Sequence, residues 1–182
     1  MGFTQCEKDQ CIFSLVTENG IIIVAIFVDD LLFFFNYVEL HLSIKERLFK
    51  TFSMKDLGDV RKCFGLNAVR DRKNRIITLD QEEYMNPILK NFRMNDCEKC
   101  STPMEEVINA TLTKSESCDI NLLYRSLVGS LMYSYMTIRP DIRFSVDILS
   151  KFSNSYQKEH WNEAKRVLRY LKEIIHYYLN LE

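Results

Sequence analysis

The sequence predicts an α+β fold in which antiparallel strands come first and helices follow. Apolar segments of strand length, separated by turn residues, fill much of the first 80 residues. From residue 81 onward, apolar residues recur mainly at helical spacing. Hydrophobic residues make up 47% of the 182-residue chain and aromatic residues 12%. This composition is enough for a sizeable core and argues against global disorder.

The first three strands form a run of hairpins in this prediction. They are expected at residues 11–17, 21–28 and 31–35. Asn19-Gly20 separates the first two and is a strong hairpin signal. Residues 21–28 are apolar without alternation, so both faces of that strand are expected to be buried.

A helix and another hairpin are expected next. Asn36 could cap the helix, and its apolar stripe is formed by Leu40, Ile44, Leu48 and Phe52. The hairpin is expected to have strands at residues 62–70 and 75–79, joined by a polar turn.

The remainder is expected to be helical, apart from a polar loop at residues 95–117. The expected helices span residues 81–92, 121–137, 140–153 and 159–178. Pro87 lies inside the first of them and should kink it or mark an early start, because proline removes a backbone donor.

Asp29 and Asp30 are the candidate functional residues, expected at the turn between the strands 21–28 and 31–35. They are adjacent carboxylates within an apolar stretch. Burying an unpaired carboxylate costs several kcal/mol, and two side by side also repel. The pair must therefore sit at an exposed turn or face a cation. These residues alone leave both an ordinary acidic turn and a metal site open.

Charge and cysteine usage exclude some classes of protein. A net charge of −1 gives no overall attraction to nucleic acid or to an acidic membrane, so such binding needs a local patch. The N-terminus lacks the pattern of a secretory signal, and we expect an intracellular protein, in cytoplasm or nucleus, with reduced thiols. Cys97-x-x-Cys100 has the spacing of half a zinc site, but no second pair follows. The apolar stretch 21–35 is too short to span a membrane.

Several short segments occur in a fixed order along almost the whole chain. They are Phe27-Val28-Asp29-Asp30, Met54-Lys55-Asp56-Leu57-Gly58, Phe64-Gly65-Leu66, Cys100-Ser101-Thr102-Pro103-Met104, Tyr124-Arg125-Ser126-Leu127-Val128-Gly129-Ser130-Leu131-Met132-Tyr133 and Arg139-Pro140-Asp141. Together they resemble the reverse transcriptases of copia-like LTR retrotransposons. The first segment is similar to the family's Tyr-Val-Asp-Asp box, and the Tyr124–Tyr133 block is the most diagnostic.

The resemblance implies an RNA-directed DNA polymerase, a nucleotidyltransferase that acts on an RNA or DNA template-primer. It implies a partial palm at residues 1–80, with the Asp-Asp hairpin and a primer-grip-like hairpin, followed by an all-helical thumb- or connection-like region at residues 81–182. Asp29 and Asp30 would be the catalytic residues and Mg²⁺ ligands, since hard cations take oxygen ligands. The last helix carries four basic residues at helical spacing: Lys165, Arg166, Arg169 and Lys172. They would bind nucleic acid by tracking its phosphates, or form an ordinary solvated face.

The chain also departs from the family pattern. Phe27 stands where the family usually has Tyr, and a third catalytic Asp is expected well upstream, whereas only 28 residues precede Asp29. We therefore expect an internal part of a Pol polyprotein that is inactive in isolation, with the rest of the polyprotein as a partner. A non-catalytic nucleic-acid-binding remnant and an inert pseudogene product stay open as alternatives. An unpaired apolar strand edge also predicts self-association.

Overall fold

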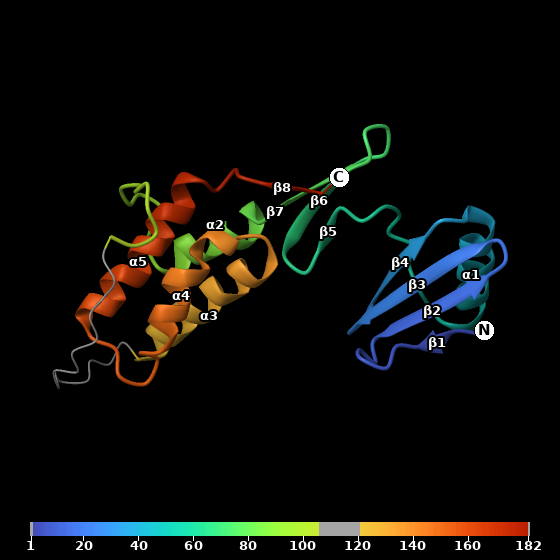
Figure 1. Ribbon diagram of the computed structural model, residues 1–182, viewed down its shortest axis with the longest axis horizontal. Helices are drawn as coiled ribbons and strands as arrows, with labels where there is room; N and C mark the ends of the chain where they lie inside the picture. The colour runs from blue at the N-terminus through green and yellow to red at the C-terminus, as the bar shows by residue number, and fades with distance from the viewer. Residues whose placement is uncertain (1, 106–120, 182) are drawn as a thin grey trace. The chain divides into compact units, whose positions relative to one another are not determined.

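A computed structural model describes residues 2–105 and 121–181 (Figure 1). The fold is α+β, as predicted, with two four-stranded antiparallel sheets. The chain divides into two compact units, Met1–Gly58 and Asp59–Glu182. Within the second unit, β6 (Leu66–Asp71) contacts α2 (Glu82–Asn91). The predicted loop at residues 95–117 is irregular as far as it is described, and its later part lies outside the described residues.

The first unit is a sheet with one helix on it (Figure 1). Its elements are, in order, β1 (Thr4–Gln5), β2 (Ile12–Thr17), β3 (Gly20–Phe27), β4 (Asp30–Phe35) and α1 (Val38–Thr51). The strands lie side by side in sequence order. The three predicted strands and the predicted helix are therefore confirmed, and β1 is an addition that its two exposed residues gave no pattern to reveal.

β3 does not have both faces buried, so that expectation was wrong. Ile22 and Val24 are buried against α1, where Ile44 completes a small core. Ile21 and Ile23, on the opposite face, are exposed. Because successive side chains of a strand point to opposite faces, one helix can cover only half of this apolar strand.

Asn36 has a different role from the predicted helix cap. Its side-chain Oδ1 accepts a hydrogen bond from the backbone N–H of Ile21 at 2.8 Å, and the N-cap of α1 is Tyr37. Asn36 therefore extends the β3–β4 pairing by one residue through its side chain.

The second unit combines a sheet with a helical bundle. The sheet contains β5 (Lys62–Cys63), β6, β7 (Ile76–Asp80) and β8 (Leu179–Leu181). The helices are α2, α3 (Asn121–Thr137), a 3₁₀ turn η1 (Pro140–Ile142), α4 (Arg143–Ser150) and α5 (Lys158–Glu173). α2 continues through Pro87. The bundle encloses the main core, whose fully buried members include Leu127, Leu131, Leu149 and Leu168.

The predicted strand at residues 62–70 is in fact two strands. Cys63 pairs with Leu66, so Phe64 and Gly65 form a two-residue turn with φ of 54° and 71°. Positive φ at both central positions is the geometry of a tight hairpin turn. The Tyr133 hydroxyl of α3 donates to the Phe64 carbonyl and anchors the turn to the bundle.

The region 81–182 is not all helical, and this corrects the prediction. The helix predicted at residues 159–178 ends at Glu173, and β8 then pairs antiparallel with β7. The Thr78 hydroxyl donates to the Asn180 Oδ1 at 2.9 Å across this pair. The helix predicted at 140–153 begins as the 3₁₀ turn and ends at Ser150.

Candidate functional site

Asp29 and Asp30 lie at the tip of the hairpin formed by β3 and β4. Phe27 pairs with Asp30, so Val28 and Asp29 form the turn and Asp30 begins β4. The predicted turn position is thus shifted by one residue. Both carboxylates are exposed, which avoids the cost of burying them.

The turn itself is conformationally costly. Val28 has φ of 50° and an exposed fraction of 82%. A β-branched residue rarely adopts positive φ, because its Cβ substituents clash with the backbone. The β3–β4 ladder on either side, from Ile22–Phe35 to Phe27–Asp30, holds the turn in this geometry.

Asp29 and Asp30 fit one side of a metal site. Carboxylate oxygens are the ligands that Mg²⁺ prefers, and Mg²⁺ commonly binds one or two protein carboxylates together with substrate phosphates. Within residues 2–105 and 121–181, no group of three or more His, Cys, Asp or Glu side chains could hold a metal ion. Among the described residues, Asp29 and Asp30 are therefore two adjacent candidate ligands from one hairpin.

The basic residues of α5 do not stand free in solvent. Lys172 Nζ donates to the Cys97 carbonyl at 2.8 Å, and Arg169 Nε donates to the Glu98 carbonyl at 2.8 Å. Both bonds fasten the segment that follows α2 onto α5. Lys165 lies over the ring of Trp161, with Nζ 5.6 Å from the ring centroid.

Arg166 is largely buried, with 15% of its side chain exposed. It donates to the Thr102 hydroxyl at 3.1 Å and forms an ion pair with Glu105 at 2.6 Å. Its backbone carbonyl lies 3.4 Å from the Cys100 thiol. Three of the four basic residues thus hold residues 97–105 in place, a contact that helical spacing alone could not reveal. Their role in nucleic-acid binding stays a prediction.

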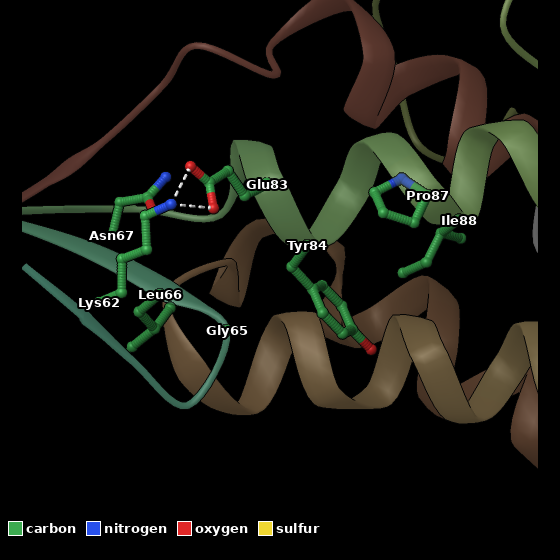
Figure 2. Close-up of a pocket in the computed structure, with 8 residues that line it drawn as sticks. All are labelled: Lys62, Gly65, Leu66, Asn67, Glu83, Tyr84, Pro87 and Ile88. Atoms are coloured by element: carbon green, nitrogen blue, oxygen red, sulfur yellow. Dashed lines mark hydrogen bonds and ion pairs between the residues drawn. The ribbon is translucent and has the colours of Figure 1, made fainter.

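A shallow cavity of ≈ 340 Å³ lies between the β5–β6 hairpin and α2 (Figure 2). Its apolar wall is formed by Leu66, Tyr84, Pro87 and Ile88. At one end, Lys62 Nζ pairs with both Glu83 carboxylate oxygens, at 2.6 and 2.7 Å. Since Glu83 neutralises Lys62, an anionic ligand would have to break this ion pair.

The described part of the chain has no helix long and apolar enough to cross a membrane. Cys97 and Cys100 are not disulfide-bonded and lie in the segment held by α5. Cys118 lies outside the described residues.

The architecture and the site define a class: an α+β protein that presents an exposed pair of aspartates on a tight antiparallel hairpin. Comparison with known proteins agrees with this description. The family described as reverse transcriptase (RNA-dependent DNA polymerase) matches residues 1–106. The chain belongs to this family. The matched region includes the Asp29-Asp30 hairpin and both halves of the β6–β7 hairpin.

Three of the relatives come from transposons of plants and yeast. A retrovirus-related Pol polyprotein from the Nicotiana tabacum transposon TNT 1-94 is 36% identical over 93% of this chain. A putative transposon Ty5-1 protein of Saccharomyces cerevisiae is 34% identical over 94% of the chain. The Pol polyprotein of the Arabidopsis thaliana transposon RE2 is 32% identical over 94%. These matches confirm the resemblance to copia-type retrotransposon reverse transcriptases.

The chain matches only part of each relative. It covers 13% of the tobacco polyprotein, 55% of the yeast protein and 12% of the Arabidopsis polyprotein. The relatives thus place sequences of this kind within longer Pol polyproteins. No solved structure gives a significant match to the chain.

Proposed function

We propose that the chain supplies the catalytic Asp-Asp hairpin of a copia-type reverse transcriptase, which copies an RNA or DNA template from a primer. The observation that carries the proposal is the position of Asp29 and Asp30. The two carboxylates are adjacent and exposed at the end of a hairpin whose register is regular over six pairs. Membership of the reverse transcriptase family supports the assignment.

Asp29 and Asp30 are the residues that would hold Mg²⁺ in this proposal. When bound, the ion supplies positive charge that stabilises the attacking and leaving oxygens of phosphoryl transfer. The carboxylates contribute hard oxygen ligands, and the β3–β4 ladder fixes their spacing. Their exposure leaves room for the phosphates of a nucleotide and a primer end.

The finer assignment divides the chain into a partial palm at residues 1–80 and a thumb- or connection-like region at residues 81–182. The Asp-Asp hairpin and the β6–β7 hairpin both precede residue 81, in the order expected of the family. The remainder is mainly helical. In the intact enzyme, the template-primer and other parts of the Pol polyprotein would be the partners.

The isolated chain is inactive in this proposal. A two-metal site needs ligands on both sides of the ions, about 4 Å apart, and one hairpin provides only one side. Mg²⁺ dehydrates reluctantly, so two adjacent carboxylates alone bind it weakly. Activity then requires a carboxylate from a further segment of a Pol polyprotein.

Complementation of primer extension tests the proposal. We expect no extension by the chain alone, and template-dependent extension after addition of a tobacco Pol segment that carries the reverse transcriptase region preceding the match. Asp29→Asn or Asp30→Asn should abolish this activity, because the amide keeps the shape and removes the charge. Glu18→Gln, at the β2–β3 turn on the other end of β3, is the matched control and should leave it unchanged. Equal loss in all three variants would contradict the assignment of the two aspartates.

Direct Mn²⁺ binding gives a readout that does not depend on turnover. Water-proton relaxation should detect weak binding by the parent chain, and the signal should fall in Asp29→Asn and Asp30→Asn but persist in Glu18→Gln. Unchanged binding in both aspartate variants would show that the ion binds elsewhere.

A further inference from the structure

The β3–β4 hairpin carries Asp29 and Asp30, and the register of its two strands decides where the carboxylates lie. Register in an antiparallel pair is normally set by the polar and apolar pattern of the strands and by the turn between them. A shift of one residue, which would pair Phe27 with Leu31 in place of Asp30, would move every side chain of β4 to the opposite face. The features that fix the register therefore also position the two aspartates.

The side-chain pattern of the two strands does not distinguish these registers. Beyond the first residue of each, β3 and β4 contain only apolar residues, so neither strand alternates. Leu31 and Phe33 pack against the buried cluster of the first unit. After the shift, Leu32 and Phe34 would take their places with the same two side-chain types. The ring of His41, which contacts that of Phe33, would then have Phe34 in the same place.

The turn favours the shifted register. Val28 and Asp29 form a two-residue turn in which Val28 has φ of 50°, a position where such turns favour glycine. The shift would make a three-residue turn, and turns of that length commonly place positive φ at their third residue. That residue would be Asp30, and aspartate tolerates this conformation better than a β-branched side chain does. Another contact must therefore hold the observed register.

Asn36 makes that contact at the opposite end of the hairpin. Its Oδ1 accepts a hydrogen bond from the Ile21 N–H at 2.8 Å, and its own N–H donates to the Ile21 carbonyl at 3.4 Å. A Cβ on Gly20 would lie 2.6 Å from Asn36 Oδ1 and 2.7 Å from Tyr37 Cβ, so the absence of a side chain at Gly20 makes room for the amide. After the shift, Asn36 would lose both bonds and take the apolar place of Phe35, which costs free energy.

We propose that Asn36 is a positioning residue, which holds Asp29 and Asp30 in place by fixing the β3–β4 register from the other end of the hairpin. The inference rests on the proposed function for the role of the two aspartates. Removal of the Asn36 amide should let β4 shift by one residue, because the turn then gains and no polar contact is lost. Asp30 would leave the ladder and join Asp29 in the turn, and the two carboxylates would change position.

Nuclear magnetic resonance of the isotope-labelled full chain measures the register directly. Hydrogen-bonded and non-hydrogen-bonded pairs alternate from the bonded pair Asn36–Ile21, so Val24–Phe33 is a non-hydrogen-bonded pair with Cα atoms about 4.5 Å apart. In Asn36→Ala we expect the Hα–Hα contact of Val24 with Phe33 to be lost and one with Phe34 to appear. Asn36→Asp keeps an acceptor oxygen in the same place and should keep the contact with Phe33. A shift in Asn36→Asp would overturn the proposal.

Three further variants separate this role from a general effect on the sheet. Thr17→Val is the matched control, since it removes two hydrogen bonds to Gly20 at the same end of β3 without touching β4, and it should not shift the register. Gly20→Ala should displace the Asn36 side chain and cause the shift even if Asn36→Ala fails to fold. Val28→Gly, added to Asn36→Ala, should restore the observed register, because glycine accepts the positive φ of the two-residue turn. An unshifted register in both Asn36→Ala and Gly20→Ala, or a shift in Thr17→Val, would overturn the proposal.

Primer extension complemented by the tobacco Pol segment connects the register to the aspartates. We expect extension to be lost in Asn36→Ala, as in Asp29→Asn, and kept in Asn36→Asp and Thr17→Val. Full extension by a chain with a shifted register would overturn the positioning role and leave the proposed function standing. Full extension by Asp29→Asn would instead contradict the proposed function, and the Val24 contacts would still decide whether Asn36 fixes the register.

Discussion

The two compact units differ in how completely they bury their apolar residues. In the first unit, only Ile22, Val24 and Ile44 form the buried cluster, and one face of the sheet is open. In the second unit, fifteen buried residues from α2, α3, α4 and α5 and the segments between them form one core. Stability rises with the apolar area removed from water, so the second unit should be the more stable of the two. The candidate catalytic residues therefore lie on the less stable unit.

A second difference lies in the polar contacts. Arg139 in the second unit is buried and forms two hydrogen bonds with the Asp141 carboxylate, at 3.0 and 2.7 Å. The Tyr170 hydroxyl donates to the same carboxylate at 2.9 Å. In the first unit the ion pair between Lys45 and Asp56 is more exposed, and exposed pairs contribute little. The second unit is therefore held together by both its apolar core and its buried polar contacts.

Truncation of a core residue should give the largest difference between the units. Leu168→Ala in α5 removes a fully buried side chain and should cost about 2–5 kcal/mol of unfolding free energy. Ile23→Ala on the open face of β3 should cost about 1 kcal/mol or less, since Ile23 is already partly exposed. Trp161, the only tryptophan, reports urea unfolding of the second unit by fluorescence, and amide exchange reports the first. Equal losses would remove the contrast between the two cores.

Release of residues 97–105 from α5 should have the next largest effect. Arg166→Gln removes a mostly buried charge that pairs with Glu105 and should cost about 1–3 kcal/mol. Limited proteolysis should then cut the segment faster. Lys151→Gln, an exposed charge at the end of α4, is the control and should change neither property.

The basic residues of α5 also allow a test of nucleic-acid binding. Replacing Lys165, Arg166 and Arg169 together with Glu should abolish any salt-dependent binding of an RNA–DNA duplex if these residues track phosphates. Undiminished binding by the triple variant would leave the three residues with a structural role only. The single variant Lys165→Glu should keep the segment in place, because Lys165 contacts Trp161 rather than residues 97–105.

Relief of the strained turn should stabilise the weaker unit. Val28→Gly at φ of 50° should add about 1 kcal/mol, because glycine adopts positive φ without a steric penalty. Amide exchange of the β3–β4 hairpin should slow accordingly. Val28→Ala, which keeps a Cβ, should gain less. A loss of protection in Val28→Gly would show that the turn is not strained.

Acidification should weaken both units slightly, each through one histidine. Burial lowers the pKa of His160, which stacks on Phe152 with ring centroids 4.0 Å apart. Burial also lowers the pKa of His41, and the positive charge of Lys45 lowers it further. The unfolded chain takes up these protons more readily. Stability is therefore complete above the unfolded pKa of about 6.5 and declines as pH falls toward the lowered folded values. His160→Gln should remove the decline in stability of the second unit, measured by Trp161 fluorescence. His41→Gln should leave that decline unchanged.

The sequence predicted most of the elements because their local patterns are strong. Asn19-Gly20 marked the first hairpin, and the stripe of Leu40, Ile44 and Leu48 marked α1. The acidic hairpin was also predicted, since two carboxylates in an apolar stretch can only be accommodated at an exposed turn or by a cation. These features depend on residues that are neighbours in sequence.

The features that the sequence did not predict depend on distant contacts. β8 is a three-residue strand that exists because β7 lies beside it. The basic residues of α5 follow a helical spacing typical of a charged face, but their partners at residues 97–105 lie more than 60 positions earlier in the chain. The open face of β3 likewise reflects how many helices cover the sheet, which the apolar pattern of the strand does not determine.

The pairing of β8 with β7 has a consequence for the order of events during synthesis. Leu79 and Leu179 are partners across this ladder, so the second sheet joins chain segments about a hundred residues apart. The first unit comprises residues 1–58 and can form while the ribosome is still translating the helices. The second sheet is completed only after residues 179–181 emerge. During that interval, β7 has only one of its two partner strands.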